Sequence, residues 1–139
     1  MDEYKSSLDA RDAAAGLSTP GYWGFHPYAD VDNRHKQAMA DFRARMPAGK
    51  QFWLTEVGSR VDSNCKNQAG AFYQCNTAQQ QADDATYLFD TSAPAADVKV
   101  NRIYYYQWRE PNTTKKWDSG LVSPSGTARP VYTVLKNHT

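Results

Sequence analysis

The sequence has little of what marks a membrane protein or a nucleic-acid-binding protein. No apolar run approaches the roughly 20 residues that cross a bilayer, and the polar start from Met1 to Lys5 lacks the apolar core of a signal peptide. The 16 Lys and Arg residues are balanced by 15 Asp and Glu residues, without a long basic stretch that could hold a phosphate backbone. We therefore expect a soluble protein whose partners include no membrane and no nucleic acid.

Cysteine is scarce as well. Cys65 and Cys75 enclose a short polar segment, and no His or further Cys lies nearby to complete a zinc site. The pattern favours a disulfide within a loop and no metal site, with two free surface thiols as the alternative. Because cytosolic thiols stay reduced, a disulfide would indicate a secreted or extracellular protein.

The 139 residues are enough for one domain with its own core, spanning residues 1–139. Turn residues and apolar periodicity predict four helices and three strands that alternate along the chain. Asp32 or Asn33 is expected to cap the second helix, and Thr77 the third. The expected helices are 2–15, 33–46, 78–90 and 130–136, and the expected strands are 22–26, 51–55 and 98–108. This order predicts an α/β fold with right-handed crossovers and a parallel sheet.

Three parallel strands are few, because both faces of a parallel sheet need cover. Two open edges would also invite pairing with another chain. We therefore expect self-association into a homo-oligomer that covers the open sheet. A fragment of a longer enzyme, with further strands upstream, is the alternative.

Polar and aromatic side chains close each predicted strand. In alternating α/β folds, ligands bind beyond the carboxyl ends of the strands. The residues at those ends are His26 and Tyr28, then Glu56, then Trp108. Because side chains alternate between the two faces of a strand, we expect all four to share one face. The same alternation assigns that face to Tyr22, Phe52, Leu54, Tyr104 and Tyr106.

The residue types at these strand ends suit carbohydrate chemistry. Retaining glycoside hydrolysis needs two carboxyl groups about 5 Å apart, one of which attacks the sugar while the other protonates the departing oxygen. Glu56 could supply the first carboxyl group, and flat rings can stack on the C–H faces of a sugar. Taken singly, each residue has a plainer interpretation: a solvent-exposed Glu at a strand end, a structural His and a core Trp.

Four stretches together resemble the C-terminal half of clan A retaining glycoside hydrolases, the group that includes families 5, 39 and 128. Residues 24–28 (GFHPY) are similar to the sixth barrel strand, 53–58 (WLTEVG) to the seventh and 104–108 (YYYQW) to the eighth, and 117–121 (WDSGL) to the close of such domains. The resemblance implies a partial (β/α)8 barrel of about three parallel strands and four helices. It also implies a β-linked glycan or glycoside as substrate and no obligatory cofactor.

The same resemblance implies roles for individual residues. Glu56 takes the nucleophile position, His26 and Tyr28 lie near the substrate, and Trp108 forms the floor of the sugar site, with Tyr106 beside it as a further substrate-binding residue.

The sequence departs from the clan at the acid/base, which is a Glu preceded by Asn, because no Asn-Glu pair occurs here. Glu110, just past Trp108, is the remaining candidate for that role, with an exposed loop residue as the alternative. A non-catalytic carbohydrate-binding remnant is the competing function.

Overall fold

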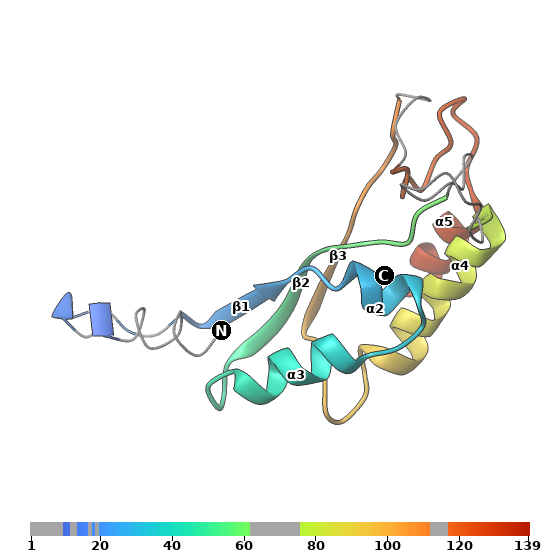
Figure 1. Ribbon diagram of the computed structural model, residues 1–139. Coiled ribbons are helices and arrows are strands. Elements are labelled where there is room, and N and C mark those ends of the chain that lie inside the picture. Colours follow the sequence, from blue (N-terminus) through green and yellow to red (C-terminus); the bar gives the residue numbers. More distant parts are fainter. Residues whose placement is uncertain (1–9, 12–13, 17, 19, 62–75, 112–116) are drawn as a thin grey trace, which may run out of the picture.

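The computed structural model describes residues 10–11, 14–16, 18, 20–61, 76–111 and 117–139. Its strands form one parallel sheet in the order β1 (Tyr22–Phe25), β2 (Gln51–Val57) and β3 (Arg102–Tyr105). After β1 come α2 (Tyr28–Asp32) and α3 (Gln37–Arg45); after β2 come α4 (Ala78–Tyr87) and the π-helical turn η1 (Leu88–Ser92); α5 (Pro130–Asn137) follows β3. The alternation seen in Figure 1 confirms the predicted α/β fold with a parallel sheet.

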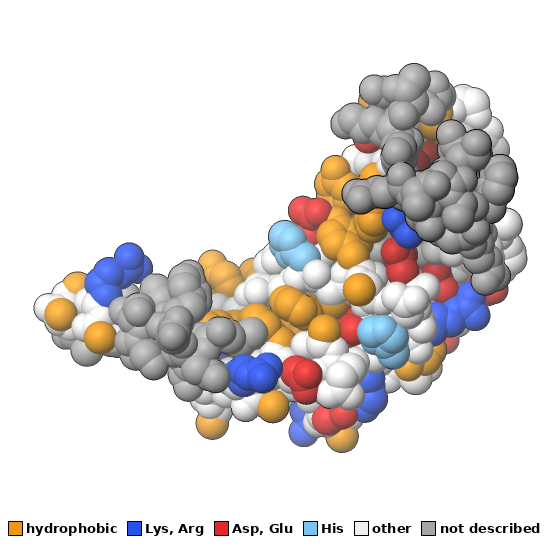
Figure 2. Space-filling view, in the orientation of Figure 1, with side chains coloured by type: hydrophobic (Ala, Val, Ile, Leu, Met, Phe, Trp, Pro, Cys, Tyr) orange, Lys and Arg blue, Asp and Glu red, His pale blue; other side chains and the backbone are white. Residues whose placement is uncertain are grey.

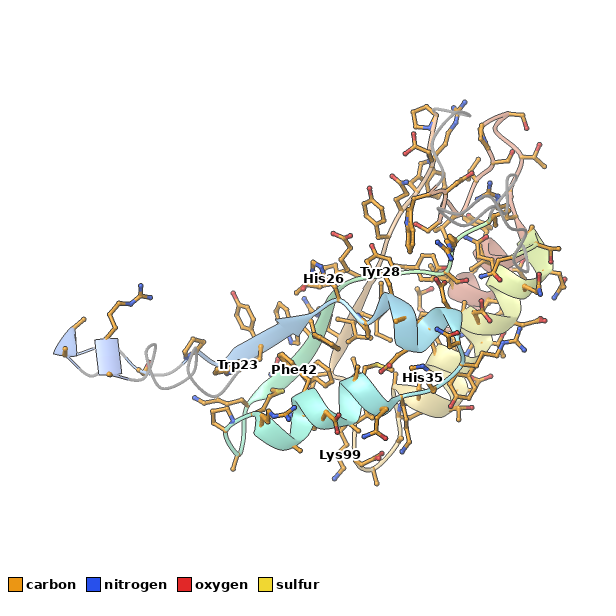
Figure 3. The ribbon with its side chains drawn as sticks, viewed as in Figure 1. Trp23, His26, Tyr28, His35, Phe42 and Lys99 are labelled. Atoms are coloured by element: carbon orange, nitrogen blue, oxygen red, sulfur yellow. The ribbon has the colours of Figure 1, made fainter. Side chains whose placement is uncertain are left out.

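The helices cover one face of the sheet and bury the main core there. Phe52, Leu54 and Val57 of β2 are fully buried on this side. Phe42 of α3 stacks on Phe52, with ring centroids 5.2 Å apart, and lies between α3 and the strands in Figure 3. Burial of these large side chains gives the sheet its fixed position against the helices, at about 1.5–3 kcal/mol for each.

The opposite face of the sheet is open. Tyr22 is 55% exposed and Tyr104 is 46% exposed, and Tyr22 stacks on Trp53 with centroids 4.2 Å apart. Figure 2 shows this side as a concave flank on which hydrophobic side chains gather along the strands. The predicted face was wrong for Phe52 and Leu54, which point toward the helices because their aromatic and aliphatic bulk fills the core.

A β-bulge changes the alternation at the end of β2. Leu54 pairs with Ile103 and Val57 pairs with Tyr105. Three residue steps along β2 therefore match two steps along β3, so β2 carries one extra residue here. Val57 is therefore buried like Leu54, while the two residues between them, Thr55 and Glu56, are at least partly exposed. An extra residue of this kind re-aims the side chains beside it, and here it turns Glu56 away from the core.

The predicted second helix, 33–46, begins later than expected, at Gln37, and the short helix α2 precedes it. Neither Asp32, which ends α2, nor Asn33, which follows it, caps α3; the chain turns after them, with Arg34 at a φ of 50°. The buried carboxylate of Asp30 accepts hydrogen bonds from the amides of Ala38 and Met39 at 3.2 and 2.8 Å. This carboxylate caps α3 from the preceding helix, a long-range contact that the local cap signal does not reveal.

The starts of α4 and α5 agree with the sequence prediction. Thr77 caps α4 through a capping box with Gln80, and Pro130 begins α5, as predicted. Most of the predicted first helix, 2–15, lies outside the described residues, as do Cys65 and Cys75, so the disulfide stays a prediction. In the ranges that are described, no helix has both the length and the apolarity to span a membrane.

Gly58, directly after β2, lies tightly against the segment that follows β3. A Cβ at this position would lie 2.2 Å from the backbone oxygen of Tyr106 and 3.2 Å from Cβ of Ser119. The lack of a side chain therefore lets β2 lie against both β3 and the loop that carries Ser119.

We predict that Gly58→Ala lowers the free energy of unfolding by about 1–3 kcal/mol, because an added methyl group must push the backbone of Tyr106 away. Urea unfolding followed by circular dichroism measures this change. Gly21→Ala is the matched control, since its Cβ meets nothing within 4 Å, and it should stay within about 0.5 kcal/mol of the parent protein. Equal unfolding midpoints for the two variants would contradict the close approach.

Candidate active site

Glu56 and Tyr28 meet at the carboxyl end of the sheet. The Tyr28 hydroxyl donates a hydrogen bond to Glu56 Oε1, and both side chains are half-buried. Tyr28 is the first residue of α2, and Glu56 lies on the bulge of β2. Their contact therefore joins the carboxyl ends of the first two strands, which is the rim at which such folds bind ligands.

The environment of Tyr28 keeps its proton in place. Burial, and next the hydrogen bond to Glu56, raise the pKa of Tyr28 far above its ordinary value. Tyr28 is therefore a neutral hydrogen-bond donor to Glu56 throughout the neutral pH range. Such a donor orients the carboxylate and keeps one of its oxygens at a fixed position.

His26 is held on the same face by the residue before Glu56. His26 Nε2 lies 3.1 Å from Thr55 Oγ1, and Figure 3 shows the imidazole on the side of the sheet away from α3. Gly24 makes room for this pair, because a Cβ there would lie 2.8 Å from Thr55 Oγ1. The structure thus places His26, Tyr28 and Glu56 at one rim, with Thr55 as a supporting residue that sequence reasoning missed.

Trp108 lies at the rim, and its ring contacts a residue of α5. Its side chain is 62% exposed, and its ring meets Tyr132 of α5 edge-on, with centroids 6.0 Å apart and an interplanar angle of 76°. Tyr106, 38% exposed, continues the open face beyond β3. Both rings are accessible to a ligand, as a stacking platform requires.

The indole that contacts the Tyr28–Glu56 pair is Trp117. Its ring meets that of Tyr28 edge-on, with centroids 4.9 Å apart and an interplanar angle of 88°. The Arg60 guanidinium lies over the Trp117 ring, 5.5 Å from its centroid. Sequence reasoning included Trp117 only as part of a domain-closing stretch, because nothing in the local pattern connects it with a residue 89 positions earlier.

Glu110 is buried, not exposed as expected for a loop residue. Only 6% of it is accessible, because the chain after β3 is covered by the returning segment: the amides of Leu121 and Val122 donate to the backbone oxygens of Gln107 and Trp108 at 2.9 and 3.0 Å. Gln107 Nε2 lies 3.5 Å from Glu110 Oε2. Glu110 thus contacts Gln107, and Glu56 contacts Tyr28.

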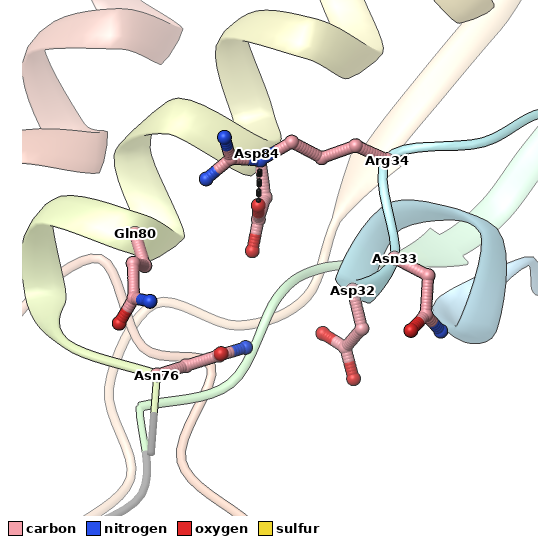
Figure 4. A pocket seen from close by; sticks show the side chains of 6 residues that line it. All are labelled: Asp32, Asn33, Arg34, Asn76, Gln80 and Asp84. Carbon is pink, nitrogen blue, oxygen red and sulfur yellow. Dashed lines mark hydrogen bonds and ion pairs between the residues drawn. The ribbon is translucent and has the colours of Figure 1, made fainter. Parts of the chain in front are cut away.

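A polar pocket of about 290 Å³ opens beside α2 and α4 (Figure 4). Asp84 on its wall is buried and accepts hydrogen bonds from Arg34 Nε and Ser59 Oγ, both at 2.6 Å. Burial raises the pKa of Asp32 on the facing wall, partly offset by Arg60. The remaining lining residues are Asn33, Asn76 and Gln80. Among the described residues, no group of three or more His, Cys, Asp or Glu side chains is placed to hold a metal ion.

Comparisons by sequence and by structure give different results. No family model matches the sequence, and no curated protein matches it. Solved structures do match. A β-glucuronidase from Bifidobacterium dentium complexed with coumarin-3-O-glucuronide is 12% identical, with a TM-score of 0.57 over 86% of this chain and 20% of the other. A glycoside hydrolase family 2 β-galacturonidase from Eisenbergiella tayi is 13% identical, with a TM-score of 0.52 over 84% of this chain and 22% of the other.

The fold is part of a (β/α)8 barrel. A β-glucuronidase from an uncultured Clostridium species matches to the same extent, at 7% identity, a TM-score of 0.56, and coverage of 84% of this chain and 22% of the other. This chain therefore spans about a fifth of the length of these enzymes. At such low identity the likeness establishes the barrel fold alone.

We predict that the protein loses stability as the pH rises above about 10, the ordinary pKa of tyrosine. Burial raises the pKa of Tyr105 as well as that of Tyr28. The folded state therefore binds more protons than the unfolded state above that pH, so the stabilisation present at lower pH is lost as the pH rises. Thermal unfolding between pH 8 and 11 measures the slope.

Tyr105→Phe should flatten this dependence, because it removes one of the two groups. Tyr22→Phe, at an exposed ring, is the control and should follow the parent protein. Identical slopes for the parent and Tyr105→Phe would show that Tyr105 does not retain its proton in the folded state.

Proposed function

We propose that this chain belongs to a glycoside hydrolase that cleaves β-linked glycans or glycosides by a retaining mechanism, with Glu56 as the nucleophile. The observation that carries the proposal is the placement of Glu56 on the open face of a barrel sheet, where Tyr28 donates to one carboxylate oxygen. His26 at the same rim, and the accessible rings of Tyr106 and Trp108, support it. The neighbours' architecture agrees with this class of reaction.

The carboxylate chemistry follows from this geometry. With Oε1 engaged by Tyr28, Glu56 Oε2 attacks the anomeric carbon, and a glycosyl–enzyme ester forms while the bond to the departing oxygen breaks. The departing oxygen keeps the electron pair and takes a proton from an acid. Water then attacks the anomeric carbon, its proton passes to the same group acting as base, and Glu56 leaves as a carboxylate. His26 orients sugar hydroxyls, and Trp108 stacks on the sugar ring.

Glu110 is the proposed source of that proton. Its side chain is 6% exposed and lies beside the Gln107 amide, in the segment that follows β3. A reaction with an activated phenol leaving group depends little on this proton, since the phenolate departs unaided. Leaving-group ability therefore separates the roles of the two carboxyl groups.

A non-catalytic carbohydrate-binding protein is the second candidate. The sequence feature that favours it is the absence of the Asn-Glu pair found at the acid/base of the resembling clan. Such a protein would keep the rings and the hydrogen-bonding groups but would not complete the proton transfer. Sugar binding in calorimetry, with no release of phenol from an activated aryl β-glycoside, would favour this function over hydrolysis.

We predict that Glu56→Gln reduces phenol release from aryl β-glycosides by about 1000-fold or more, because an amide does not form the glycosyl ester. Circular dichroism establishes that the variant is folded. Asp41→Asn, an exposed change on α3 that also removes one negative charge, is the control and should keep the parent rate. Unchanged release by Glu56→Gln would exclude it as the nucleophile.

The proposed acid role of Glu110 can be tested by comparing glycosides with different leaving groups. Glu110→Gln should slow the hydrolysis of glycosides with poor leaving groups far more than that of dinitrophenyl glycosides. An equal effect on both would remove Glu110 from the role.

We also propose that a second copy of the chain covers the open sheet. In the described part of the chain, β1 and β3 each pair with β2 alone, so each has a free edge. Tyr22 and Tyr104 expose large rings on the face between those edges. Free edges and exposed rings together favour association with another chain.

Sedimentation velocity over a concentration series should therefore show a homo-oligomer. Tyr22→Lys combined with Tyr104→Lys should shift the protein toward monomer, because like charges would then face each other across the contact. The exposed change Asp41→Asn should leave the distribution as it is. A monomer at every concentration for the parent protein would contradict the proposal.

We further propose that Cys65 and Cys75 form a disulfide in an exported protein, as the cysteine pattern predicts. Titration of free thiols in the unfolded, unreduced chain tests this: none should react, and two reactive thiols would refute it.

A further inference from the structure

Trp117 contacts Tyr28 from outside the sheet. The two rings meet edge-on at 4.9 Å, and the hydroxyl of Tyr28 holds Glu56. We propose that Trp117 is a positioning residue of the candidate active site, which keeps Tyr28 against Glu56 by limiting the rotation of the Tyr28 ring. This inference rests on the proposed function for its catalytic consequence, although the positioning itself can be measured without any turnover.

The segment from Trp117 to Ser119 is fixed in place by hydrogen bonds and an ion pair. Arg129 forms a two-pronged ion pair with Asp118, at 3.0 and 2.5 Å, and this pair is mostly buried. The backbone oxygen of Asp118 accepts a hydrogen bond from the amide of Val61 at 2.7 Å. Ser119 next to it is fully buried and accepts from Trp117 Nε1 at 3.3 Å. A side chain on so well-anchored a loop can act as a fixed stop for its neighbour.

A second contact joins the Trp117 indole to α2 through Arg60. Arg60, whose guanidinium lies over the Trp117 indole, also approaches Asp32, with Nε 3.7 Å from Oδ2. Asp32 lies four residues after Tyr28 in α2, so both side chains project from the same side of that helix. The Trp117 loop therefore meets α2 at two points one turn apart, directly at Tyr28 and through Arg60 at Asp32. Two points of contact resist rotation of α2 better than one.

Trp108 differs from Trp117 in its exposure and in the residue it contacts. It is also an indole at the rim, but it is 62% exposed and contacts Tyr132 on α5. Its expected contribution is a surface for the sugar, whereas that of Trp117 is the geometry of the nucleophile. Loss of Trp108 should therefore weaken substrate binding and raise KM, while loss of Trp117 should lower kcat.

The positioning can be read directly from the Tyr28 hydroxyl proton by NMR in protein labelled with ring-¹³C tyrosine. In the parent protein, this proton should exchange slowly with water, because it is hydrogen-bonded to Glu56 and half-buried; its loss in Tyr28→Phe assigns the signal. We expect Trp117→Ala to broaden the signal beyond detection and Trp117→Phe, which keeps an aromatic ring, to retain it. Trp108→Ala, the matched indole deletion, should leave the signal in place.

The outcomes of this measurement separate the alternatives. A Tyr28 hydroxyl signal that survives Trp117→Ala unchanged would overturn the inference. Should Trp117→Ala not fold, Trp117→Leu keeps the apolar bulk without the ring and carries the same expectation. A signal lost equally in Trp108→Ala would also overturn it, since the effect would then not be specific to the Trp117 contact.

Measurements of kcat test whether the positioning by Trp117 affects catalysis. If Trp117 acts through Tyr28, Trp117→Ala should lower kcat on an aryl β-glycoside by about 10- to 100-fold, the range expected for a small misplacement of reacting groups. Adding it to Tyr28→Phe should then cause no further loss; an additive loss would contradict action through Tyr28. Absence of turnover in the parent protein would count against the proposed function, while the NMR comparison would still decide the positioning role.

Discussion

The bulge in β2, together with the hydrogen bond that Tyr28 donates to Glu56, is the feature on which the candidate active site depends. Regular alternation would carry Glu56 to the side of Phe52 and Leu54, the side on which the helices bury the β2 residues Phe52, Leu54 and Val57. The extra residue turns the carboxylate to the open face, and Tyr28 then fixes one of its oxygens. Gly58 allows this arrangement, since the chain just past Glu56 lies against the backbone of Tyr106.

Sequence patterns predicted the layout of the fold because that layout depends on local signals. Thr77 and Pro130 mark helix starts by their own chemistry, and strand ends in such folds place His26 and Glu56 at one rim. The errors arose where distant residues decide the structure. A bulge depends on the partner strand, so alternation alone assigned the wrong face to Phe52 and Leu54. Likewise, Asp30 caps α3 across a turn, and the returning segment after β3 buries Glu110.

Two kinds of support surround Glu56, and they come from different parts of the chain. Tyr28, with His26 held through Thr55, belongs to the strands and helices of the barrel segment. Trp117 belongs to a loop whose position is fixed by the buried pair of Arg129 with Asp118. A carboxylate supported in this way, on a face with exposed aromatic rings, has the parts that a sugar-cleaving site needs. The open sheet around it also accounts for the expected association with a second copy.

Mass spectrometry of the intact chain after incubation with an activated 2-deoxy-2-fluoro β-glycoside tests the central claim most directly. The fluorine slows hydrolysis of the glycosyl–enzyme, so the ester accumulates even when acid assistance is weak. The account predicts one added sugar per chain, located on Glu56 by fragmentation of its peptide. An unlabelled chain across a panel of such sugars, or a label on any other residue, would contradict it.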